Sequence, residues 1–98
     1  MVVGTLQVSL RLDGCRSLKD KRHLVRGLLE RLRREFQVAA AEVDDHGLWG
    51  NAEIGIACVS ASRIHAESIL QHAVNRIEAS AQIEVAGVAR EFCDPSTS

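Results

Sequence analysis

Apolar and polar residues alternate along the start of the chain, which is the period of a β-strand with one buried face. The side expected to face the core carries Val2, Leu6, Val8, Leu10 and Leu12. The opposite, mostly polar side carries Val3, Thr5, Gln7, Ser9 and Arg11. Because Asp13-Gly14 is a turn signal, the pattern predicts a strand over residues 2–12.

Beyond this turn the apolar residues are spaced three and four apart, which predicts a helix that begins after Ser17 and ends at Gln37. Ser17 is the expected N-cap, and Asp20 lies in the first turn, where the helix dipole favours negative charge. The apolar stripe comprises Leu18, Leu24, Val25, Leu28, Leu29, Leu32 and Phe36. Lys21 falls at the same angle, and we expect its ammonium group to extend along the surface into solvent.

The rest of the chain shows further strand patterns and one more helix. Strands are predicted over residues 38–44, 52–60 and 83–92, with a loop over residues 45–51. The buried side of the second of these strands would carry Ala52, Ile54, Ile56 and Cys58. Ser60 and Ser62 are both candidate caps of a helix with the apolar stripe Ala66, Ile69, Leu70, Ala73, Val74 and Ile77.

The predicted order is therefore β-α-β-β-α-β. Each helix has one apolar stripe and each strand one better apolar face, so two helices on one face of a four-stranded antiparallel sheet is the economical arrangement. This is the ferredoxin-like α+β fold. We expect residues 1–93 to form a single domain and residues 94–98 a disordered tail.

Composition narrows the function classes. The chain has 98 residues, and no apolar run approaches the roughly 20 residues of a membrane-spanning helix, so we expect a cytoplasmic protein without a membrane partner. Cys15, Cys58 and Cys93 are far apart and lack any CxxC pairing, which favours free thiols over a disulfide framework or a zinc site. No nucleotide-binding or nucleophile motif occurs, and no cofactor is predicted.

Charge is unevenly distributed. Residues 17–36 hold seven basic and three acidic side chains, a net +4, whereas the rest of the chain has a net charge of −5. Lys19, Arg22, Arg26 and Arg33 project within one sector of the helix, beside the apolar stripe. Such a row can follow the phosphates of RNA, although nothing in it is specific for DNA. The alternative is a solvated face, partly paired with Glu30 and Asp20.

The open face of the predicted sheet offers a different surface. The residues expected on it are Thr5, Gln7, Ser9, Arg11, Glu42, Asp44, Glu53 and Gly55. None is aromatic, and the carboxylates would repel phosphate, so base stacking on the sheet is not expected. A polar face with small residues could instead pair with a second copy, which makes a homodimer a candidate.

The predicted hairpin between the two middle strands carries the last candidates. Glu42, Asp44, Asp45, His46 and Glu53 cluster around it and could hold a metal ion, but no metal-binding motif is present, so no metal is assigned. Trp49 is expected to fold back over the core; if exposed, it would be a candidate protein-contact residue.

Four parts of the chain resemble the YlxP-like family of small uncharacterised bacterial proteins: the segment from Arg16 to Asp44, the Leu48-Trp49 pair, the strand from Ala52 to Ser60 and the second helix. The S-L-K-x-K-R block of that family stands here as Ser17, Leu18, Lys19, Lys21 and Arg22. The resemblance implies a ferredoxin-like fold and genes placed near those of translation and ribosome-maturation factors, but no activity.

Three functions follow from these observations. The leading hypothesis is a non-enzymatic binding module that contacts RNA or a ribonucleoprotein through the basic helix. The second is a homo-oligomeric protein-interaction domain that uses the sheet face or the Trp49 loop. The third is a metal-dependent enzyme at the hairpin acids.

Overall fold

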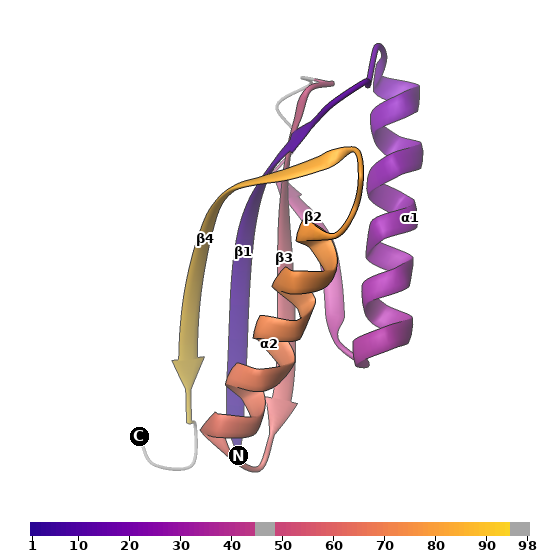
Figure 1. Cartoon of the computed structure of the whole chain (residues 1–98). Coiled ribbons are helices and arrows are strands. Elements are labelled where there is room, and N and C mark those ends of the chain that lie inside the picture. Colours follow the sequence, from indigo (N-terminus) through magenta and orange to yellow (C-terminus); the bar gives the residue numbers. More distant parts are fainter. Residues whose placement is uncertain (45–48, 95–98) are drawn as a thin grey trace.

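The computed structural model describes residues 1–44 and 49–94 (Figure 1). Its elements are β1 (Val2–Leu12), α1 (Leu18–Phe36), β2 (Ala39–Asp44), β3 (Asn51–Ser60), α2 (Arg63–Glu78) and β4 (Ile83–Cys93). The predicted order of strands and helices is confirmed. Asp45 and His46 lie outside the described residues, as do four residues of the predicted tail, 95–98.

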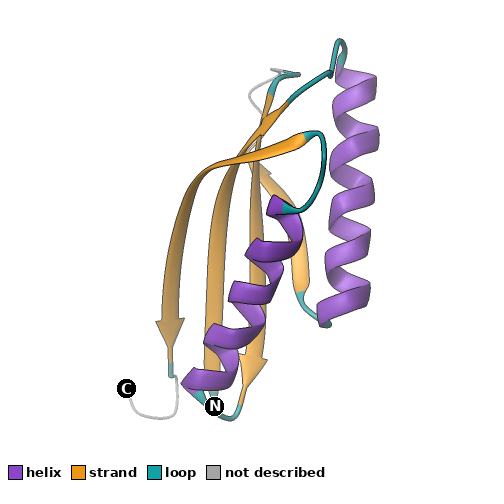
Figure 2. Ribbon diagram, viewed as in Figure 1, coloured by secondary structure: helices purple, strands orange, loops and turns teal. Residues whose placement is uncertain are grey.

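The four strands form one antiparallel sheet in the order β2-β3-β1-β4. Both helices cover the same face of this sheet, as Figure 2 shows, so the ferredoxin-like arrangement is confirmed. Helix α1 lies against β2, and α2 lies over β1, β3 and β4. The opposite face of the sheet is left without a covering layer, and we call it the open face.

The core lies between the helices and the face of β1 predicted to be buried. Leu6, Val8 and Leu10 of the central strand have at most 2% of their surface exposed. The buried sides of β3 and α2 are also those predicted, apart from the half-buried Ile69. Gly4 allows α2 to approach β1 closely, because a Cβ at this position would lie 3.1 Å from Leu70 Cδ1.

Side-chain caps fix where the helices begin, and a backbone hydrogen bond closes the end of α1. Ser17 Oγ accepts a hydrogen bond of 3.1 Å from the Asp20 amide, and Ser62 Oγ accepts one of 3.1 Å from the His65 amide. Ser62, and not Ser60, is therefore the cap of α2. At the other end of α1, Gln37 adopts a left-handed conformation and donates its amide proton to the Arg33 carbonyl.

Two predictions about the stripe of α1 are wrong. Leu18 is 37% exposed, because the first turn extends beyond the edge of the core. Lys21 does not reach solvent: it is only 2% exposed, and its Nζ atom lies 3.3 Å from Glu42 Oε2 on β2.

A bulge in β2 explains a further error. Glu42 is paired with Ile54 on the helix side of the sheet, and the register then shifts before Asp44 pairs with Glu53. The extra residue, Val43, brings Asp44 to the open face while Glu42 remains on the other. Glu42 is thus not on the open face where alternation predicted it.

No helix among the described residues is long and apolar enough to cross a membrane.

The burial pattern of α1 makes a stability prediction. Leu32→Ala should lower the free energy of unfolding by about 2–5 kcal/mol, because Leu32 has no exposed surface and its truncation leaves a cavity. Leu18→Ala, the same change in the same helix, should cost under about 1 kcal/mol. Urea titration followed by circular dichroism measures both, and equal losses would contradict this description of the stripe.

Candidate nucleic-acid interface

Three of the four predicted basic residues meet at one hollow. Arg22, Arg26 and Arg33 line a depression of about 350 Å³ between α1 and the edge strand β2. Their spacing of four and seven residues keeps them on one side of the helix. Val25 and Leu29 contribute the apolar part of the lining, and two carboxylates also belong to it, Glu30 and Glu42.

Arg33 is held in place by the backbone of β2. Its Nε and Nη2 atoms donate hydrogen bonds of 3.0 and 2.5 Å to the Ala40 carbonyl oxygen. Ala40 belongs to an edge strand, so this contact satisfies a carbonyl at the rim of the sheet. Arg33 therefore joins helix to strand, and its guanidinium group is fixed at the mouth of the hollow.

The negative charge of Glu42 is neutralised by the buried Lys21, which lies beneath the hollow. The 3.3 Å contact between Lys21 Nζ and Glu42 Oε2 is an ion pair without hydrogen-bond geometry, since this buried oxygen accepts no hydrogen bond from the described residues. The pair contributes no net charge, which leaves the three arginines opposed by Glu30 alone. Sequence reasoning missed this pair; a lysine within an apolar stripe and a glutamate within an apolar strand were its signals.

Arg22 and Arg26 remain available. Both side chains are exposed, and neither forms an ion pair or hydrogen bond with any residue of the described ranges 1–44 and 49–94. Pairing of the basic sector with Glu30 or Asp20, the alternative expected from the sequence, is not observed: Asp20 instead accepts a 3.1 Å hydrogen bond from the Arg16 amide. Two free guanidinium groups next to a fixed third can accept an anion without first breaking an internal contact.

Lys19 does not join this hollow. It lines a separate depression of about 380 Å³ at the start of α1, together with Cys15, Asp20 and His23. Burial raises the pKa of the Cys15 thiol, Asp20 raises it further, and the Lys21 ammonium group lowers it in part. A raised pKa lowers the fraction of thiolate, the nucleophilic form, at neutral pH.

The hairpin acids are divided by the sheet. Asp44 and Glu53 are paired on the open face, whereas Glu42 lies on the helix side. Glu53 accepts a 2.6 Å hydrogen bond from the Ser9 hydroxyl and a weaker one, 3.4 Å, from the Gln7 amide group. Within the described part of the chain, no three His, Cys, Asp or Glu side chains gather as a metal site would require.

Trp49 is 53% exposed, so the expectation that it folds back over the core is wrong. Its role in a protein contact stays a prediction. The three cysteines are free thiols, and Cys58 is buried in the core as expected.

The chain is similar to a known protein family, to one bacterial protein and to one solved structure. The model of a family described as "Protein of unknown function (DUF503)" matches residues 3–90. The uncharacterized protein YlxP of Bacillus subtilis (strain 168) is 35% identical over 68 residues, which are 69% of this chain and 74% of that protein. A de novo designed protein with a ferredoxin fold, solved by NMR, is similar with a TM-score of 0.63 and 17% identity, covering 100% of this chain and 91% of its own.

The clamp between Arg33 and β2 can be tested by stability. Arg33→Ala should lower the free energy of unfolding by about 1 kcal/mol, because it removes a charge-assisted hydrogen bond to the edge strand. Arg26→Ala, which breaks no contact to a described residue, should change it by less than about 0.5 kcal/mol. Equal effects in urea titrations would show that the Arg33 contact does not stabilise the fold.

The electrostatic cause of the Cys15 shift makes a pH-dependent prediction. Asp20→Asn removes a negative charge, so the pKa of Cys15 should fall and its thiolate fraction at pH 8 should rise. Alkylation of Cys15 by iodoacetamide, followed by peptide mass spectrometry, should accelerate by roughly two- to fivefold. Asp13→Asn, a neighbouring carboxylate in the same depression, is the matched control and should leave the rate unchanged.

Proposed function

The chain belongs to the DUF503 family of proteins of unknown function, as its resemblance to the YlxP-like family predicted, and we propose its function from its own surface. It is a non-enzymatic module that binds RNA or a ribonucleoprotein in the cytoplasm. The contact surface is the hollow between α1 and β2, which we call the arginine hollow and which Arg22, Arg26 and Arg33 define.

One observation carries this proposal: two exposed arginines without a described partner stand beside a third that the backbone holds rigid. A fixed guanidinium group loses little side-chain entropy when a phosphate binds, and the Nη protons of Arg33 that Ala40 does not engage can be donated to phosphate oxygens. The two mobile arginines can then adjust to the next phosphates along the strand.

The charge of the remaining chain supports the same orientation. Outside residues 17–36 the net charge is −5, so a polyanion is repelled from most of the surface and attracted to α1. Glu53 adds negative charge to the open face, and no described residue of that face is aromatic, so this face is unsuited to base stacking.

Contacts of this kind position a protein on RNA without reading its sequence. Arginine–phosphate pairs release counterions, so binding should weaken steeply as salt is added. Selectivity for one RNA would have to come from its shape, or from a protein neighbour in a ribonucleoprotein. Lys19, which lies in the adjacent depression, would add an outer contact only for a longer RNA.

Salt-dependent binding tests the proposal. Fluorescence anisotropy with a labelled single-stranded 20-nucleotide RNA, repeated from 50 to 300 mM KCl, gives the slope of log affinity against log salt. Arg22→Gln/Arg26→Gln should weaken binding at least tenfold at low salt and reduce the slope by about 1.4, since each single-strand phosphate contact contributes about 0.7.

Arg31→Gln/Arg34→Gln is the control, because it removes the same charge from exposed positions of the same helix outside the arginine hollow. If both double variants bind equally weakly, binding follows net charge and the hollow has no special role. If neither differs from the wild type, α1 is not the RNA-contacting surface. Pelleting with purified ribosomal subunits extends the comparison from free RNA to a ribonucleoprotein.

A further inference from the structure

The open face is polar at one end and apolar at the other, which alternation along the single strands did not show. The register aligns its residues in rows that cross the strands. The charged end consists of the rows Asp44-Glu53-Ser9-Gly87 and Asn51-Arg11-Glu84. The other end consists of the rows Val59-Val3-Cys93, Ala39-Ala57-Thr5-Glu91 and Ala41-Gly55-Gln7-Ala89.

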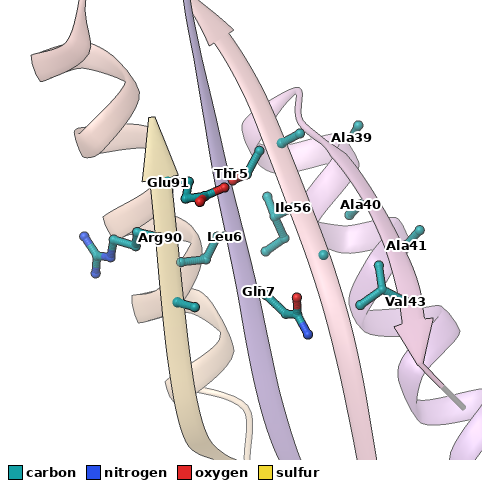
Figure 3. Close-up of a pocket in the computed structure, with 13 residues that line it drawn as sticks. Thr5, Leu6, Gln7, Ala39, Ala40, Ala41, Val43, Ile56, Arg90 and Glu91 are labelled. Carbon is teal, nitrogen blue, oxygen red and sulfur yellow. The ribbon is translucent and has the colours of Figure 1, made fainter. Parts of the chain in front are cut away.

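This apolar end carries one charged side chain, Glu91, among the eleven residues of its rows. Val59 is 65% exposed, and the bulge residue Val43 is also exposed beside Gly55. Between them the face is hollowed into a trough of about 710 Å³, lined in part by Thr5 and the alanines of β2 (Figure 3). Figure 3 looks onto this face with the helices behind the sheet.

The chemistry of the face excludes a polyanion as its occupant. Its one cationic residue among the paired rows, Arg11, lies 3.6 Å from Glu84 in an ion pair, and the remaining charges are carboxylates. Pairing through the edge of β2 is also hindered, because Arg33 already occupies the Ala40 carbonyl. The open face itself, rather than the β2 edge, is therefore the surface available for association.

We propose that the open face binds a second copy of this chain and forms a two-fold symmetric dimer by sheet-on-sheet packing. A rotation axis parallel to the strands and between the sheets would place β2 of one copy opposite β4 of its partner, and β3 opposite β1. This inference does not depend on RNA binding, since α1 lies on the other side of the sheet.

The proposed rotation suits the charges of the face. It places each Glu91 opposite Ala39 of the second copy, and each Glu53 opposite Ser9. Asp44 would similarly face Gly87, so no two carboxylates of the paired rows coincide. A partner of unrelated sequence would have to match this distribution separately, whereas a second copy matches it in the orientation that this rotation gives.

The area of the face agrees with a reversible dimer. Nine residues of β1 span about 27 Å and four strands about 19 Å, which gives roughly 500 Å² per copy. The total of roughly 1,000 Å² lies at the lower limit of specific interfaces, so the dimer should dissociate on dilution.

Sedimentation velocity of the full chain from 1 to 500 µM tests the dimer. The wild type should shift from monomer to dimer over this range, and Val59→Lys should raise the dissociation constant at least tenfold, because a lysine would be placed in an apolar contact. Ile64→Lys is the matched control: Ile64 is 82% exposed on α2, so the same change there should leave the dissociation constant unchanged. Circular dichroism confirms that each variant is folded.

A second pair of variants tests the arrangement. Ala39→Glu should weaken the dimer, because it faces the partner copy's Glu91, whereas Ala39→Lys should preserve or strengthen it. A wild type that stays monomeric at 500 µM overturns the proposal. So does a dimer that responds equally to the Val59 and Ile64 variants, or one that Ala39→Lys weakens more than Ala39→Glu.

Discussion

The burial of one face of the sheet beneath both helices is the constraint from which the other surfaces follow. β1 is paired on both sides, and Leu6, Val8 and Leu10 all point to the same layer of helices. With two helices on that layer, none is left to cover the opposite face. The sheet must also end in two edge strands, and the shorter of them, β2, lies against α1. The arginine hollow and the open face are both products of this asymmetry.

The positive charge of α1 serves two purposes. Lys21 is consumed by the ion pair with Glu42, and Arg33 is bonded to the Ala40 carbonyl, so these two cations attach the helix to the edge strand. The same contacts bring Arg33 next to Arg22 and Arg26, which have no described partner. A net charge read from sequence overstates what a ligand encounters, because part of it is neutralised internally. The net charge also does not show that one of the remaining cations, Arg33, is held in place by its hydrogen bonds to β2.

Much of the fold was predictable because its signals are local. The alternation of residues 2–12 and the caps at Ser17 and Ser62 depend on neighbours in the chain, and the structure agrees with them. The errors concern contacts between elements. In β2 the small alanines give no preference for either face, and the bulge at Val43 leaves no sequence signal, so Glu42 was placed on the wrong side. For the same reason the apolar end of the open face became visible only when the register joined residues from four strands.

The two proposed surfaces would reinforce one another if a single RNA contacted both copies of the dimer. Sheets that pack face to face lie about 10 Å apart and helices are about 10 Å thick, so the α1 helices of the proposed dimer would be on opposite outer sides, roughly 30 Å apart. One compact RNA could contact both arginine hollows only if it passed around the side of the dimer. Two separate RNA segments could instead bind to the two hollows independently. If one RNA engages both, dimer formation and RNA binding must promote each other by the same factor. A weak sheet interface would then be sufficient, because the RNA would raise the effective concentration of the second copy.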